Sequence, residues 1–164
     1  LGGLGALAKP LTAAPIRALH VAAKHPFNRS HWAYLPDEAG PFYRVGVQSA
    51  FSPANAPEGC ASFYVELPGN TRPSPREENR ILSALAQKGI IKKEAVLFTF
   101  WQYLPHAYAL YDFARTPAVQ QAVRRLEGLG ALLAGRYGLW EYSFMERGFL
   151  QGRQAALDLL KDLA

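Results

Sequence analysis

Four stretches in the first third of the chain have the character of β-strands, and no helical pattern separates them. They span residues 16–23, 31–35, 44–51 and 61–67; each is short, rich in aromatic or β-branched residues, and bounded by Pro, Gly or Asp. In the last of them apolar and polar residues alternate, which is typical of a strand with one buried face. Strands that follow one another without helices favour antiparallel pairing over a parallel βαβ arrangement.

Helical patterns dominate the rest of the chain. The first helix is expected over residues 74–89, because S-P-R-E forms a capping box with proline at the first helical position. Two more helices are expected over residues 116–130 and 144–163, and one more strand over residues 94–104. The sequence therefore predicts an α+β fold, with an antiparallel or mixed sheet covered by about three helices.

Composition narrows the class of protein. Nearly half of the 164 residues are apolar, which is typical of a globular domain, and no run of about 18 apolar residues could cross a membrane. The net charge of +5 favours anionic partners, but the basic residues are scattered, so nucleic acid is only a weak alternative. A single cysteine, Cys60, cannot form an internal disulfide and favours a cytoplasmic location. The sequence begins with Leu, so we expect it to be part of a longer protein.

The sequence lacks the usual self-contained catalytic motifs. It contains no G-x-S-x-G elbow, no P-loop and no G-x-G-x-x-G fingerprint. The four histidines show no i, i+4 pairing and Cys60 has no neighbouring thiol, so no metal site is predicted. We therefore predict neither a catalytic side chain nor a metal ligand in this chain.

The segment GRYGLWEYSFMERGFLQG, residues 135–152, combines glycine, arginine and aromatic residues with the start of the last helix. We expect residues 131–143 to form a strand that ends in a glycine-kinked turn before that helix. The exposed amides of a helix N-terminus attract anionic groups. Arg136 could form paired hydrogen bonds to a phosphate or a carboxylate.

Two glycines, Gly148 and Gly152, lie four residues apart inside the last predicted helix. A glycine in a helix interior costs about 1 kcal/mol relative to alanine, so this pair indicates a close neighbour. That neighbour could be a flat ring system. A tight crossing within the chain, with Trp140 and Tyr142 in the core, explains the same pattern.

The segment GRYGLWEYSFMERGFLQGRQAA resembles the C-terminal flavin-contacting segment of the FAD-dependent amine oxidase superfamily. It is most similar to the protoporphyrinogen-oxidase-like and UDP-galactopyranose-mutase-like branch, which reads G-R-x-G-x-W/Y-x-Y-x-x-M before a helix with G-x-x-A-A. Residues 31–67, with H-W-x-Y-x-P, P-F-Y-R-V and N-x-A-P-x-G, resemble the substrate-domain strands of that branch. Residues 97–130 are similar to the segment that precedes its flavin-contacting strand.

The resemblance implies that FAD is the cofactor of the complete protein. Residues 1–134 would be the substrate-binding domain, and residues 135–164 the flavin-contacting strand end and C-terminal helix. That helix would pack on a Rossmann-type dinucleotide-binding domain that this sequence lacks, so the chain alone would hold FAD poorly. Its N-terminus at Met145 would face the flavin edge that gains negative charge on reduction. The cofactor-binding residues implied by the resemblance are Gly135, Arg136, Tyr137, Gly138, Trp140, Tyr142, Met145 and Glu146.

The resemblance further implies an oxidoreductase in which the flavin accepts a hydride while the protein holds a flat or carboxylated substrate over it. The candidate substrate-binding residues are Trp32, Tyr34, Arg44, Trp101, Tyr103, Tyr108 and Tyr111. Trp101 and Tyr103 should point to one face of their strand. Each aromatic ring could instead belong to the core, and Arg44 could pair with Glu66 across strands. The alternative function is a flavin-independent binding module that keeps the fold.

Overall fold

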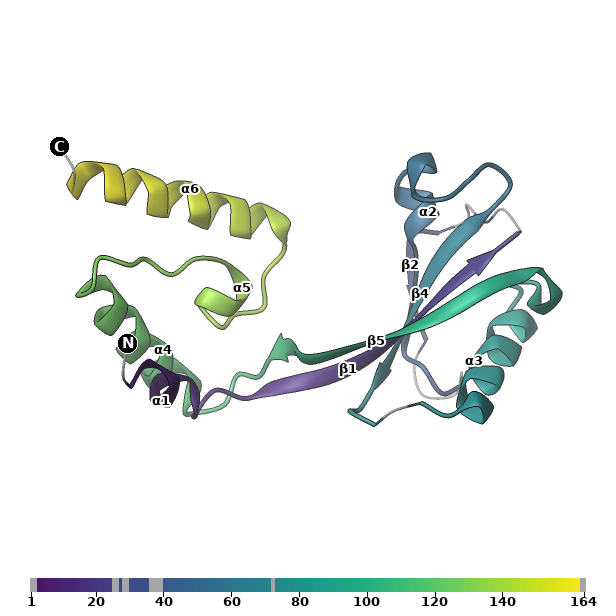
Figure 1. Ribbon diagram of the computed structural model, residues 1–164, viewed down its shortest axis with the longest axis horizontal. Helices are drawn as coiled ribbons and strands as arrows, with labels where there is room; N and C mark the ends of the chain where they lie inside the picture. The colour runs from purple at the N-terminus through teal and green to yellow at the C-terminus, as the bar shows by residue number, and fades with distance from the viewer. Residues whose placement is uncertain (1–2, 25–26, 28–29, 36–39, 72, 163–164) are drawn as a thin grey trace. The chain divides into compact units, whose positions relative to one another are not determined.

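A computed structural model describes residues 3–24, 27, 30–35, 40–71 and 73–162 (Figure 1). The chain forms two compact units. One consists of Pro15–Pro105, and the other joins Leu1–Ala14 to His106–Ala164. The predicted functional division at residues 134 and 135 is a different division of the chain and stays a prediction.

A five-stranded sheet is the main feature of the first unit. Its strands are β1 (Ala13–Ala23), β2 (Trp32–Tyr34), β3 (Arg44–Val47), β4 (Ala61–Pro68) and β5 (Val96–Ala109), in the order β2-β3-β4-β1-β5. The pairs β2–β3, β3–β4 and β4–β1 are antiparallel, with Arg44 opposite Glu66 and Glu66 opposite Ala18. The five strands predicted between residues 16 and 104 are thus confirmed, as is antiparallel pairing in these three pairs.

Two strand boundaries differ from the prediction. The strand expected over residues 44–51 ends at Val47, where the short helix α2 (Gln48–Phe51) and the 3₁₀ turn η1 (Pro53–Asn55) begin. Pro53 has no N–H for a strand ladder, and the Ser52 hydroxyl accepts a hydrogen bond from the Ala54 amide, so the chain turns here. β5 continues beyond the expected residue 104 through Pro105, which the sheet tolerates because β5 is an edge strand.

The core lies between the sheet and α3 (Pro75–Gln87). Ile81 and Leu85 of this helix are fully buried against Leu19, Phe63 and Val65 of the strands. The predicted capping box is confirmed at its first bond, because the Ser74 hydroxyl accepts from the Glu77 amide at 3.1 Å. The short turn η2 (Lys93–Ala95) then leads into β5. Alternation along β1 places His20 on the opposite face from Leu19.

The second unit is helical. It contains α1 (Leu4–Ala8), α4 (Arg115–Glu127), α5 (Gly135–Gly138) and α6 (Met145–Asp162). The helices predicted over residues 116–130 and 144–163 correspond to α4 and α6. α4 begins one residue early because the Asp112 carboxylate accepts hydrogen bonds from the Ala114 and Arg115 amides.

The expected number of about three helices covering the sheet is not confirmed. Six α-helices lie within the described residues. Of these, α3 contributes the fully buried Ile81 and Leu85 to the core of the sheet, and α2 contributes the partly buried Ala50. α4 and α6 belong to the other unit. Nowhere in the described part of the chain is a helix both long and apolar enough to cross a bilayer.

Candidate functional site

The segment predicted as a flavin-contacting strand is a helical turn instead. Residues 131–134 have no regular structure, and α5 forms one turn in which the Leu139 amide donates to the Gly135 carbonyl at 3.0 Å. Gly135 has a φ of 79°, which favours glycine. Trp140 follows with a φ of 46°, an uncommon value for a bulky residue. The expected strand over residues 131–143 was therefore wrong, because a left-handed residue at each end of α5 closes the chain into a turn.

Two arginines hold the carbonyl groups of this turn. Arg115 donates to the carbonyls of Leu139 at 3.1 Å and Trp140 at 2.7 Å. Arg136 donates to the carbonyls of Ala107 at 3.3 Å and Ser143 at 2.6 Å. Arg136 was predicted to bind an anionic group, but in the structure these bonds direct it toward the backbone of its own chain.

Three tyrosines surround the two arginines. The Arg136 guanidinium lies 5.8 Å from the ring centre of Tyr108 and 5.5 Å from that of Tyr142. Arg115 lies 4.2 Å from the ring centre of Tyr111, whose hydroxyl accepts from the Tyr142 amide at 2.9 Å. The structure thus brings the substrate candidates Tyr108 and Tyr111 together with the cofactor candidates Arg136 and Tyr142.

Glu141 is an important residue of this region that the sequence did not reveal. Its side chain is largely buried and accepts two hydrogen bonds from Arg147, at 2.5 and 3.1 Å, and one from Gln151 at 2.6 Å. The hydrogen bond from Arg147 holds the pKa of Glu141 below its ordinary value. Glu141 lies outside any helical repeat, so no periodic pattern connects it to residues 147 and 151 of α6.

The start of α6 is exposed. Met145 retains 93% of its accessible surface and Phe149 73%. A Cβ atom added at Gly148 or Gly152 would meet no described atom within 4 Å. The tight crossing within the chain that these glycines could have indicated is therefore not observed among the described residues.

The remaining cofactor candidates line the same turn. Tyr137 is exposed and lies 6.2 Å from the Trp140 ring, and the Trp140 indole donates to the Thr12 carbonyl at 3.0 Å. Glu146 lies in the first turn of α6, and Gly138 closes α5. The interpretation of Trp140 and Tyr142 as core residues does not hold, since neither is buried.

Trp32, Tyr34 and Arg44 lie on the face of the sheet opposite α3. Arg44 pairs with Glu66 and donates to the Tyr34 hydroxyl at 3.2 Å. Its guanidinium also lies 5.7 Å from the ring centres of Tyr34 and Tyr64. The cross-strand ion pair that the sequence left open is thus present, and Tyr64, which the sequence did not select, joins the group.

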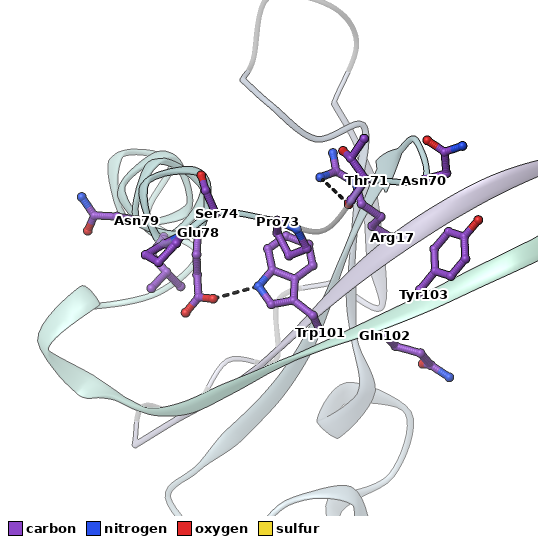
Figure 2. Close-up of a pocket in the computed structure, with 12 residues that line it drawn as sticks. Arg17, Asn70, Thr71, Pro73, Ser74, Glu78, Asn79, Trp101, Gln102 and Tyr103 are labelled. Atoms are coloured by element: carbon purple, nitrogen blue, oxygen red, sulfur yellow. Dashed lines mark hydrogen bonds between the residues drawn. The ribbon is translucent and has the colours of Figure 1, made fainter.

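Trp101 and Tyr103 line a pocket of about 900 Å³ between β5, β1 and α3 (Figure 2). The Trp101 indole donates to Glu78 at 2.8 Å, and Glu78 also accepts from the Thr99 hydroxyl at 2.6 Å. Across the pocket, Arg17 pairs with Glu77 at 2.9 Å. Trp101 and Tyr103 share one face of β5, as expected, and the Gln102 side chain between them points the other way, where it contacts His20 (Figure 2).

The seven substrate candidates therefore occupy three places. Trp32, Tyr34 and Arg44 form one group, and Trp101 and Tyr103 line the pocket on the α3 side of the sheet. The neighbour of Trp101, Phe100, points to the other side, where its ring stacks on His20 at 4.2 Å. Tyr108 and Tyr111 belong to the helical unit. Alternation on a strand separates the two faces of the sheet, and the sequence alone could not show which candidates from different strands share a face.

Comparison with known proteins identifies the fold. No family model matches the sequence. The structure is similar to that of reduced UDP-galactopyranose mutase, with a TM-score of 0.78 and 22% identity over 97% of this chain and 36% of the other. It is also similar to a protein from Exiguobacterium sp. 255-15 assigned as a protoporphyrinogen oxidase, with a TM-score of 0.57 and 13% identity over 81% of this chain and 32% of the other.

At identities of 22% and 13%, these similarities show a shared fold. The chain spans about a third of the length of either protein, as the covered shares of 36% and 32% show.

Proposed function

We propose that this chain is the substrate-binding part and the flavin-facing helix of an FAD-dependent oxidoreductase. The observation that carries the proposal is the fold similarity to reduced UDP-galactopyranose mutase over 97% of the chain, which corresponds to only 36% of that protein. The sequence resemblance at residues 135–156 supports the same assignment independently.

The start of α6 suits contact with an electron-rich group. Helix N-termini present unpaired amides and a partial positive charge, and α6 has 18 residues. Phe144 and Met145 are exposed at this end, and Gly148 leaves the backbone bare. These features fit the edge of a flavin, which would supply the redox chemistry.

An exposed apolar surface supports a missing partner domain. Along α6 the side chains of Phe149, Leu150, Leu157 and Leu160 are all exposed. Exposed apolar residues gathered on one element indicate an interface. We infer that a dinucleotide-binding domain covers α6 in the complete protein.

The substrate side of the proposal rests on one place in the sheet unit, the surface formed by Trp32, Tyr34 and Arg44. The Trp32, Tyr34 and Arg44 face offers ring surfaces and a guanidinium partly neutralised by Glu66. A flat small molecule, with or without a carboxylate, suits this surface. The residues in this proposal bind and orient the substrate, and none of them is assigned a covalent role.

A flavin-independent binding module is the second candidate. The pocket of about 900 Å³ favours it, because the cavity is bounded by sheet and helix residues of one unit and requires no other domain. Its rings, Trp101 and Tyr103, would contact a ligand without any cofactor.

The first experiment is to sequence the coding region on both sides of this chain and to purify the complete protein. The proposal expects an upstream strand, a G-x-G-x-x-G turn and a helix, together with a bound flavin seen in the visible absorbance spectrum. The 164-residue chain, purified in parallel, should lack that absorbance. A complete protein without the fingerprint and without flavin would contradict the proposal and favour the binding module.

A further inference from the structure

Glu141 connects two parts of the predicted flavin-contacting segment that are not adjacent in sequence. Its carboxylate accepts hydrogen bonds from Nε and Nη2 of Arg147 and from the side-chain amide of Gln151, and both residues lie in the first two turns of α6. The backbone of Glu141 also belongs to the turn, because its amide donates to the Arg136 carbonyl at 2.9 Å.

Gln151 extends this connection to the start of α5. While its Nε2 donates to Glu141, its Oε1 accepts from the Gly135 amide at 2.9 Å. No strand precedes Gly135, because residues 131–134 have no regular structure, so its amide has no strand partner. One chain of hydrogen bonds therefore runs from Gly135 through Gln151 to Glu141 and Arg147.

The charges in this chain are matched. Arg147 is the third residue of α6, and its charge lies where the helix N-terminus is already partly positive. Glu141 pairs with it across a short distance. Without this carboxylate, the Arg147 guanidinium would lose its ion-pair partner, and the Gln151 side-chain amide would lose its hydrogen-bond acceptor.

We propose that Glu141 is the positioning residue of the 135–147 segment, holding the first turns of α6 and the start of α5 in one arrangement through Arg147 and Gln151. Its consequence for a flavin rests on the proposed function. The positioning itself is a property of this chain alone and can be tested without a cofactor.

Asp158 provides a matched control. It lies on the same helix and accepts hydrogen bonds from a glutamine, Gln154, and a cation, Lys161, at 2.9 to 3.1 Å. Asp158 thus has the same kinds of partner as Glu141. Its partners lie within α6, so its substitution should leave the Gly135 amide unaffected.

The test is amide hydrogen exchange at Gly135, resolved by NMR in the purified protein. Glu141→Gln and Gln151→Met should each speed exchange at Gly135 by about tenfold, the effect of losing roughly one net hydrogen bond. Asp158→Asn should leave it unchanged. In the double variant Glu141→Gln with Gln151→Glu, the side-chain amide at position 141 can donate to the carboxylate at position 151, which can still accept from the Gly135 amide. This variant should return the exchange rate at Gly135 toward that of the parent.

Equal exchange at Gly135 in the parent and in Glu141→Gln would overturn the inference, as would an equal effect of Asp158→Asn. If Glu141→Gln does not fold, Gln151→Met decides, because it keeps the Glu141–Arg147 pair and removes the Gln151 hydrogen bonds that connect Glu141 to Gly135. Unchanged exchange in that variant would overturn the inference as well.

A second measurement separates this inference from the proposed function. In the complete, flavin-bearing protein, Glu141→Gln removes a negative charge near α6 and should raise the flavin midpoint potential, while Asp158→Asn should not. A complete protein that holds no flavin would contradict the proposed function. The exchange result at Gly135 would still decide the role of Glu141.

Discussion

Single residues in this chain owe their properties to partners that lie outside the local sequence pattern. Glu141 is a carboxylate buried beside Arg147 and Gln151, and Gly46 is a glycine over which the Tyr64 ring lies. Burial raises the pKa of Tyr64, in keeping with a ring packed against the sheet. Two predictions follow from these contacts.

The first concerns the pH dependence of stability. The pKa of Glu141 lies below its ordinary value of 4.5 in the folded protein, so its contribution is complete above that value. The contribution is lost as the pH falls through the folded-state pKa. Urea unfolding from neutral to acidic pH should therefore show a steeper loss of unfolding free energy in the parent than in Glu141→Gln. Parallel pH profiles for the two proteins would contradict this assignment.

The second concerns Gly46→Ala. A Cβ at this position would lie 2.0 Å from two ring carbons of Tyr64, so the ring must move away from its place beside Arg44. We expect a loss of about 1–3 kcal/mol in unfolding free energy, the usual cost of overpacking. Thermal denaturation measures it, with Gly5→Ala, whose added Cβ meets nothing within 4 Å and whose φ is not positive, as a comparison for a glycine in open space. An unchanged melting temperature for Gly46→Ala would mean that the ring moves aside freely.

At the scale of elements, the sequence of α6 does not suit a helix that faces solvent. It contains two interior glycines and exposed apolar side chains, while the described structure places nothing against Gly148 or Gly152. A helix built for solvent would have alanine or a polar residue at these positions. The disagreement supports a partner surface outside this chain.

Gly148→Ala tests this interpretation. In the 164-residue chain the substitution should raise the unfolding free energy by about 1 kcal/mol, because alanine favours the helix and the space is open. In the complete protein the gain should disappear or reverse, since the added methyl group would meet the covering domain. Arg153→Ala, on an exposed position of the same helix, should behave alike in both proteins. An equal gain from Gly148→Ala in both would indicate that this face remains in solvent.

At the scale of the whole molecule, burial is concentrated in one of the two units. The largest fully buried side chains, among them Phe63, Leu19 and Ile81, all lie within Pro15–Pro105. In the helical unit, Arg115 and Arg136 donate hydrogen bonds to backbone carbonyls, and the Glu141 carboxylate accepts from Arg147. Fewer buried apolar contacts mean lower local stability.

Hydrogen exchange followed by mass spectrometry should therefore show slower exchange in β1 and β4 than in α4 and α6. In the complete protein, α6 should gain protection relative to the 164-residue chain, because burial by a partner suppresses local opening. Uniform exchange across both units, or no gain in α6, would contradict this division of stability.

The sequence by itself determined the local elements of this protein. Period-two alternation and capping residues depend on neighbours a few positions away, so the strand over residues 61–67 and the capping box at Ser74 could be predicted. The resemblance at residues 135–156 also lies within the sequence, and it agrees with the fold similarity found from the structure.

Only the tertiary structure decided what those elements hold together. A turn begins at Gly135 where a strand was expected. Gly135 and Trp140 have positive φ values, and Arg115 and Arg136 hold the carbonyls of the turn. Arg115 lies 24 residues before the Leu139 carbonyl, so no local pattern reveals its hydrogen bonds. The candidate aromatic residues separated onto two faces of the sheet because strand order, which no local pattern encodes, places α3 on only one of them. The role of Glu141 could be recognised only in the structure, because Gln151 contacts both Glu141 and Gly135 only once α5 and α6 are packed together.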